Sequence, residues 1–312
     1  MYWKIKAAIQ NAVSLLPSSA SYAAYYQIQR HFGSLQHLDP ISTLVGGIQT
    51  WKLIQKQGHD PLGGVFFEVG TGRVPIIPVA YWLMGAKKTF TVDLNPYLKA
   101  ELVAEALNYL AENKEKVLSL FGPLINTNRF DELLKFEKNY KFNISDFLDL
   151  CSIDYMAPGN AADTNLLDQS IDFHTSYTVF EHIPLNVLKS IIEEGNRIIK
   201  NDGLFIHRID YSDHFSHSDS RISAINFLQY SDTEWKKYAN NRYMYMNRLR
   251  HDDFIDLFKS TGQSIVYTET STEQRLKYLL KNGEIDIDER FNSKSTEILE
   301  IISAWIITIK NE

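Results

Sequence analysis

Cysteine is scarce in this sequence: Cys151 is the single one, so no disulfide bond can form within the chain. This usage is typical of a reducing compartment, and we expect Cys151 to be a buried structural thiol. Apolar runs long enough to span a bilayer are lacking. Residues 1–17 also lack the uninterrupted apolar core and small-residue cleavage site of a signal peptide. We therefore expect a cytoplasmic protein that does not insert stably into a membrane.

An excess of charge of either sign is lacking as well. The 32 basic and 38 acidic residues give a formal net charge of −6 over 312 residues. Nucleic-acid-binding proteins usually gather Lys and Arg into a basic patch or stripe. The mild negative charge therefore argues against nucleic acid as the partner. The hydrophobic content of 44% is that of a globular protein with a large core.

Residues 1–60 predict an N-terminal helical cap. Apolar residues recur at helical spacing until Pro17, and further helical stretches fit 20–31 and 41–57. The first helix is basic and amphipathic. It would either pack its apolar stripe on the protein's own core or touch a membrane surface peripherally.

Residues 61–312 alternate short apolar, strand-like runs with helical stretches. The seven expected strands are 64–69, 88–93, 151–158, 170–178, 203–210, 264–270 and 302–310. The expected helices are 75–85, 96–121, 184–200 (closed by a turn at 201–203) and 251–261. Such alternation is typical of a parallel sheet with crossover helices. It predicts an α/β fold with a doubly wound, mostly parallel seven-stranded sheet and an insertion at about 211–250.

The turn after the first strand carries two glycines, Gly70 and Gly72, which favour close approach of the backbone to a ligand. A dinucleotide site would require a third glycine at position 75, where this chain has Pro75. Proline fits the start of a helix but does not give the close helix packing that the third glycine gives. A nicotinamide dehydrogenase is therefore disfavoured.

Four short motifs occur in order along the chain. They are Phe67-Glu68-Val69-Gly70-Thr71-Gly72, Asp93 at the end of the second strand, Gln169-Ser170-Ile171-Asp172 and Phe180-Glu181-His182-Ile183. This series resembles the class I S-adenosylmethionine-dependent methyltransferases, including bacterial small-molecule and glycan methyltransferases. The resemblance covers about 64–210 and the last two strands. Val74 departs from it, because the family often has a further glycine there.

The resemblance implies a Rossmann-like fold with S-adenosylmethionine (SAM) as cofactor and S-adenosylhomocysteine (SAH) as product. Asp93 would accept hydrogen bonds from both ribose hydroxyls. Asn160, or Asp163 in a shifted alignment, would contact the adenine. The residues that it implies for the cofactor site are Glu68, Gly70, Thr71, Gly72, Asp93, Leu94, Asn160, Ala161, Asp163, Ser176 and Tyr177.

Histidines and aspartates gather after the fourth and fifth strands, and ligands of parallel sheets bind at the carboxyl ends of strands. One interpretation is a general base, His214 or His182, oriented by an aspartate such as Asp213. A second is a divalent-metal site built from Asp210, Asp213, His214 or His217, and a third is a solvated loop without a catalytic role. We predict the first, with His182, His214, Asp213 and His207 as the catalytic candidates and no metal. His207 would equally fit as a core histidine.

The expected insertion at 211–250 interleaves aromatic residues with Asn and Arg. Such a surface suits a polyhydroxylated or carboxylated acceptor, and the alternative is a helical lid that packs on the core. The sequence as a whole predicts a methyltransferase that moves a methyl group from SAM to a hydroxyl of a small molecule or glycan. The alternative is a non-catalytic SAM- or SAH-binding scaffold protein. The sequence specifies neither the acceptor nor the oligomeric state.

Overall fold

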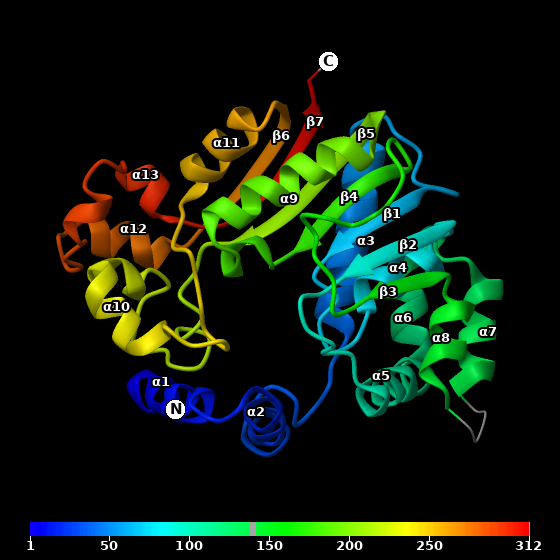
Figure 1. The fold of residues 1–312 in the computed structure, drawn as a ribbon, viewed down its shortest axis with the longest axis horizontal. Coiled ribbons are helices and arrows are strands. Elements are labelled where there is room, and N and C mark those ends of the chain that lie inside the picture. Colours follow the sequence, from blue (N-terminus) through cyan, green and yellow to red (C-terminus); the bar gives the residue numbers. More distant parts are fainter. Residues whose placement is uncertain (138–141, 312) are drawn as a thin grey trace. The chain divides into compact units, whose positions relative to one another are not determined.

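The computed structural model describes residues 1–137 and 142–311 (Figure 1). The chain divides into two compact units. Unit 1 comprises Met1–Gln36, Thr178–Lys189 and Arg208–Ile307. Unit 2 comprises His37–Tyr177, Ser190–His207 and Thr308–Glu312.

The strands of the described residues form one seven-stranded sheet in the order β3-β2-β1-β4-β5-β7-β6. Their bounds are β1 (Val65–Val69), β2 (Lys88–Val92), β3 (Ile153–Met156), β4 (Ile171–Tyr177), β5 (Ile199–Asp210), β6 (Gln263–Thr272) and β7 (Ile301–Lys310). Strand β1 pairs in parallel with β2 and β4, and β2 pairs in parallel with β3. The doubly wound α/β sheet expected from the sequence is confirmed.

The strand order places a topological switch point at β1. From β1 the chain adds β2 and β3 on one side, and β4 and β5 lie on the other side. Val69, the last residue of β1, is in register with Val92 of β2 and Ser176 of β4. The carboxyl ends of three strands therefore meet in one row, which is where open parallel sheets bind ligands.

Unit 2 holds a larger set of helices. They include α3 (Ile41–Lys56), α4 (Ile76–Leu83), α5 (Ala100–Glu112), α6 (Lys114–Phe121), α7 (Thr127–Glu137) and α8 (Ile144–Leu150), and most of α9 (Leu185–Ile198). Every residue of α4 is buried. Phe66 of β1 stacks on Tyr81 of α4 at 4.3 Å and on Trp51 of α3 at 5.9 Å between ring centroids. Cys151 is buried and free, as expected, and burial raises the pKa of its thiol.

Unit 1 contains a second aromatic core built around the first helix. Its helices are α1 (Trp3–Ser14), α2 (Ser18–Phe32), α10 (Asp232–Ala239), α11 (His251–Ser260), α12 (Gln274–Lys281) and α13 (Thr296–Leu299). Trp3 is 3% exposed, and its ring lies 5.3 Å from Phe215 and 4.8 Å from Tyr238 between centroids. The first helix thus packs a tryptophan on the core of its own unit.

Two boundaries differ from the sequence-based expectation. The turn expected at 201–203 lies inside β5, which begins at Ile199. The long helix expected at 96–121 is two helices, α5 and α6, which meet at Asn113. Across the described part of the chain, no helix has the length and apolarity needed to cross a membrane.

Candidate functional site

The glycine turn after β1 is bonded to the acid after β2. Gly70 and Gly72 have φ angles of 92° and 70°, which other residues rarely adopt. The Gly70 N–H donates to the Val92 carbonyl at 2.9 Å, and the Gly72 N–H donates to Asp93 Oδ2 at 2.7 Å. A Cβ atom on Gly72 would meet no atom of the described residues within 4 Å, so the turn borders open space. The backbone here is accessible to a ligand.

Glu68 and Thr71, two of the expected cofactor residues, point into the protein. Glu68 is 1% exposed; its carboxylate accepts a short hydrogen bond from Thr175, and Tyr81 Oη lies 3.5 Å away. Burial raises the pKa of Glu68 to about 8. Thr71 Oγ1 lies 2.7 Å from Thr91 Oγ1, and both are buried. The side chains of Glu68 and Thr71 are thus bonded within the protein beneath the turn.

The loop after β3 reaches Asp93 through the backbone. The Gly159 N–H donates to the Asp93 carbonyl at 2.9 Å, which places the next residue, Asn160, beside the second acid. Asn160 Oδ1 accepts the Ala162 N–H at 3.0 Å, and both Asn160 and Asp163 are exposed. Either side chain therefore stays a candidate for contact with an adenine. Ala161 is buried, whereas Leu94 beside Asp93 is 74% exposed.

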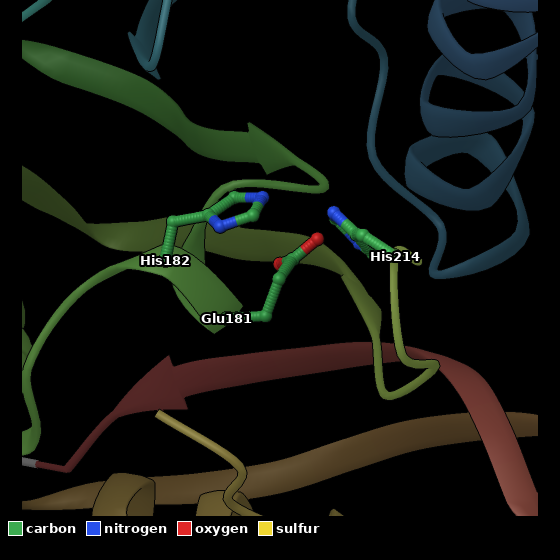
Figure 2. Close-up of side chains that lie close together, drawn as sticks. All are labelled: Glu181, His182 and His214. Carbon is green, nitrogen blue, oxygen red and sulfur yellow. The ribbon is translucent and has the colours of Figure 1, made fainter. Parts of the chain in front are cut away.

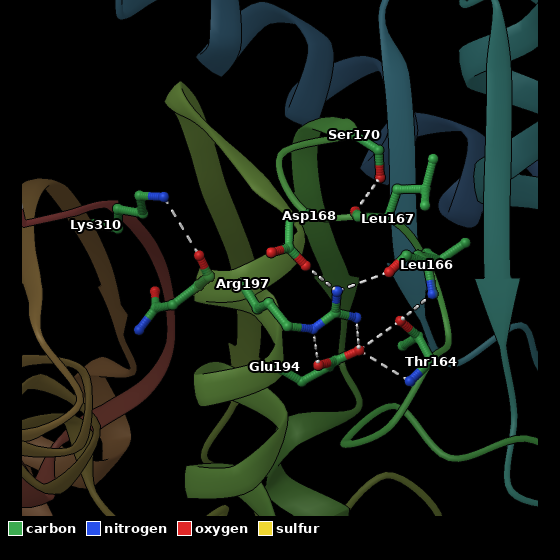
Figure 3. A network of polar contacts seen from close by, with 9 residues as sticks. Thr164, Leu166, Leu167, Asp168, Ser170, Glu194, Arg197 and Lys310 are labelled. Atoms are coloured by element: carbon green, nitrogen blue, oxygen red, sulfur yellow. Dashed lines mark hydrogen bonds and ion pairs between the residues drawn. The ribbon is translucent and has the colours of Figure 1, made fainter.

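A polar network that the sequence did not predict fixes the rest of this loop (Figure 3). Arg197 of α9 donates to Glu194 Oε2 at 2.8 Å, to the Leu166 carbonyl at 2.8 Å and to Asp168 at 2.5 Å. Glu194 Oε1 in turn accepts from the Thr164 N–H at 2.9 Å and from its hydroxyl at 2.6 Å. Arg197 and Thr164 lower the pKa of Glu194 to about 2. The loop after Asn160 is thereby held by charged hydrogen bonds.

Ser176, Tyr177 and His207 contact protein groups near the ends of β4 and β5. Ser176 Oγ lies 2.8 Å from His207 Nδ1, and both side chains are buried. Burial lowers the pKa of His207 well below its usual value, so the ring is neutral. This favours a core histidine over a catalytic one. Tyr177 packs on α3 where a Cβ atom on Gly46 would come within 2.4 Å of its ring, so glycine is required there.

A second group of polar side chains lies within unit 1. One ligating atom from each of Glu181, His182 and His214 lies within 4.8 Å of the others, and Figure 2 shows the three side chains converging. Glu181 and His182 come from the short 3-10 turn Phe180–His182 that follows β4. Burial, helped by nearby His214, lowers the pKa of His182 to about 4. His182 is therefore neutral at pH 7.

The aspartate beside His214 is Asp210, not Asp213. His214 Nε2 lies 3.4 Å from Asp210 Oδ2, and Asp210 Oδ1 accepts from the Ser212 N–H at 2.8 Å. Asp213 is fully buried, and its two oxygens accept from the Phe215 N–H and from Asn226 Nδ2. Asp213 therefore shapes the loop, and the expectation that it orients His214 is corrected.

The expected acceptor surface of the insertion is largely internal. Phe227 and Trp235 belong to the aromatic core around Trp3. Arg248 and Arg250 are 3% and 0% exposed, and both donate to backbone carbonyls. The structure thus favours the alternative of a segment that packs on the core of its own unit.

Sequence comparisons found nothing: no family model matches the chain, and no curated protein matches it. Among solved structures, magnesium protoporphyrin IX methyltransferase from Synechocystis PCC 6803 is 11% identical over 87% of this chain and 83% of its own, with a TM-score of 0.44. A SAM-dependent methyltransferase from Methanosarcina mazei is 13% identical over 82% of this chain and 96% of its own, with a TM-score of 0.46. Geranyl diphosphate C-methyltransferase from Streptomyces coelicolor A3(2) is 10% identical over 84% of this chain and 78% of its own, with a TM-score of 0.46.

Proposed function

We propose that the chain is a methyltransferase that transfers a methyl group from SAM to a hydroxyl of a small molecule or glycan. The observation that carries this proposal is the 2.7 Å hydrogen bond from the Gly72 N–H to Asp93 Oδ2. It joins the glycine turn after β1 to the acid after β2 at the switch point, where doubly wound sheets bind ligands. The open turn admits a close ligand, and a carboxylate suits the paired hydroxyls of a ribose.

The surrounding residues fit the remaining parts of SAM. Leu94 offers an exposed apolar side chain next to Asp93, suited to covering one face of an adenine. Asn160 or Asp163 would accept a hydrogen bond from the adenine amine. When bound, SAM would supply a methyl group that its sulfonium already activates. The chain's own residues would then need to hold the cofactor and remove the proton of the acceptor hydroxyl.

The group formed by Glu181, His182 and His214 supports oxygen as the methylated atom. A hydroxyl must lose its proton before or during transfer, and imidazole and carboxylate groups are the usual acceptors. His182 and His214 are the candidates for accepting this proton, and Asp210 Oδ2 lies 3.4 Å from His214 Nε2. An amine acceptor would need less assistance of this kind.

Thermal unfolding with SAH, SAM, NAD or no ligand tests the cofactor. At a hundred times its dissociation constant a ligand stabilises the folded state by about 2.7 kcal/mol. We expect SAH to raise the midpoint by several degrees, at roughly 2–4 °C per kcal/mol, and NAD to leave it unchanged. A rise with NAD alone would contradict the proposal. Tight SAH binding without methyl transfer to any of a panel of hydroxyl compounds would favour the non-catalytic alternative.

The affinity for SAH should depend on the charge of Asp93. Burial raises the pKa of this carboxyl to about 6, against the lowering effect of hydrogen bonds from backbone N–H groups such as that of Gly72. The ionised form, which accepts hydrogen bonds from ribose hydroxyls, therefore prevails above pH 6 and is lost below it. We expect affinity measured by calorimetry to fall between pH 7 and pH 5, approaching tenfold per pH unit below pH 6. The Asp93→Asn variant should lose this dependence, and a flat profile for the unaltered protein would contradict the assignment.

A further inference from the structure

We propose that Glu181, His182 and His214 bind a divalent transition-metal ion. Their ligating atoms lie within 4.8 Å of one another, and Figure 2 shows the three side chains directed toward a common point. Two imidazoles and a carboxylate form a donor set that suits zinc and its first-row neighbours better than Mg²⁺ or Ca²⁺, which favour all-oxygen sites.

The carboxylate of Glu181 lacks the partner that its burial demands. The residue is 2% exposed, and among the described residues neither carboxylate oxygen has a side-chain hydrogen-bond partner. A buried polar group without a partner is costly, and a charged one more so. A dication among these side chains would compensate the carboxylate.

The ring of His182 is held in the orientation that a metal ligand requires. Its Nδ1–H donates to the Tyr245 carbonyl at 2.8 Å, so the lone pair is on Nε2. Metal-binding histidines commonly donate their second ring nitrogen to a carbonyl or carboxylate in this way. Asn247 fixes the turn itself, because Nδ2 donates to the Phe180 carbonyl at 2.8 Å and to the Ile183 carbonyl at 2.9 Å.

Asp210 lies next to one of the three proposed ligands, His214. Two atoms each bound at about 2.1 Å to a tetrahedral ion lie about 3.4 Å apart. The separation between His214 Nε2 and Asp210 Oδ2 is also 3.4 Å. The hydroxyl of Ser212 donates to the other oxygen of Asp210 at 2.6 Å and so fixes the carboxylate. Glu181, His182 and His214 thus supply three ligands within one unit, and Asp210 lies beside the third of them.

A second grouping of Asp210, His214 and His217 overlaps the first. We favour the Glu181 group for two reasons. The His217 side chain is 54% exposed, and its Nε2 already lies 2.8 Å from the Ser212 hydroxyl. The carboxylate without a partner belongs to the Glu181 group.

The role of the ion rests on the proposed function, whereas its binding does not. A divalent ion lowers the pKa of a hydroxyl that it contacts. In methyl transfer the acceptor hydroxyl would lose its proton to solvent, the oxygen–methyl bond would form, and the sulfur–methyl bond would break to leave SAH. Polarisation by the ion would then replace proton removal by His214, since both histidine side chains would serve as ligands.

The test is a titration of chelator-treated protein with Co²⁺, followed by visible absorption and checked by competition with Zn²⁺. We expect one ion per chain and the absorption of a four-coordinate site. Glu181→Gln, which preserves the shape of the side chain, and His214→Ala should each weaken binding at least tenfold. The control is His37→Ala, at an exposed histidine of unit 2, which should bind Co²⁺ like the unaltered protein. Circular dichroism verifies the folding of each variant, and His182→Gln replaces any variant that does not fold.

The outcomes separate this proposal from the cofactor proposal. Failure of the unaltered protein to bind Co²⁺ saturably would overturn the metal site, even if SAH still raised the unfolding midpoint. Normal binding by Glu181→Gln together with loss in His217→Ala would place the ion in the other grouping and overturn the assignment. Saturable Co²⁺ binding that Glu181→Gln abolishes would support the metal site, even if SAH had no effect.

Discussion

Replacement of Asp93 by alanine should abolish SAH binding at concentrations that saturate the unaltered protein. A hydrogen bond to a charged group contributes about 1.5–3 kcal/mol, so losing two to a ribose costs about 3–6 kcal/mol, or roughly 10²–10⁴-fold in affinity. The variant also removes the acceptor that holds the Gly72 N–H at 2.7 Å, which loosens the turn. Calorimetric titration with SAH measures the effect directly.

Two further variants make the result specific. Asp93→Asn keeps the size of the side chain and one acceptor oxygen, and it should weaken binding less than alanine does. Asp154→Ala removes an exposed acid of β3, in the same unit, that pairs with Lys88 at 2.7 Å on the surface. It should bind SAH normally. Normal binding by Asp93→Ala would remove the basis for placing the cofactor at this turn.

The central strands and the acid at the end of β2 could be predicted because local sequence determines them. Gly70 and Gly72 sit directly after an apolar run, and the chain adopts positive φ at both. The direction of the neighbouring side chains could not be predicted. Both faces of a parallel sheet are covered by helices, so alternation along a strand does not tell which face meets a ligand. The family motif implied Glu68 as a cofactor contact, and in the fold its carboxylate accepts a hydrogen bond from Thr175.

The cluster of Glu181, His182 and His214, with Asp210 beside it, was predicted only in part. The Glu181-His182 pair was visible as a motif, but sequence spacing did not show that Glu181 is buried without a partner. The choice between Asp210 and Asp213 depends on a tight turn at Ser212, whose N–H bonds to Asp210. The network of Arg197 and Glu194 joins residues about thirty positions apart, and no local pattern records such pairing.

Arg250 should be among the most sensitive positions for stability. Its side chain is 0% exposed, and Nη1 donates to the Tyr211 carbonyl at 2.8 Å. Nη2 donates to the Leu299 carbonyl at 2.9 Å and, over a shorter distance, to the Ile301 carbonyl. Burial lowers its pKa to about 10, so the group is still charged at pH 7. It therefore bridges the end of β5 and the start of β7 with charged hydrogen bonds.

Arg250→Ala would leave several buried carbonyls without donors and open a cavity. We expect it to lower the free energy of unfolding, measured in urea, by about 3–5 kcal/mol. Arg250→Lys keeps the charge but lacks the planar fork that reaches several carbonyls, so it should recover only part of this loss. The control is Arg275→Ala, at an exposed arginine that donates to the Ser220 carbonyl at 3.2 Å, where a change within about 0.5 kcal/mol is expected. An Arg250→Ala variant as stable as this control would show that the carbonyls find other donors.

Substitution of Arg250 also links stability to the side chains around His214. Tyr211, whose carbonyl Arg250 binds, lies between Asp210 and Ser212. Without Arg250 the Tyr211 carbonyl loses its donor, and the turn that fixes the Asp210 carboxylate becomes free to shift. If the ion site includes Asp210, folded Arg250→Lys protein should bind Co²⁺ more weakly than unaltered protein. Its affinity for SAH should stay unchanged, because Asp93 belongs to the other unit. A parallel loss of affinity for both Co²⁺ and SAH would point to general unfolding. A loss of Co²⁺ affinity alone would identify Arg250 as a positioning residue for the Asp210 carboxylate.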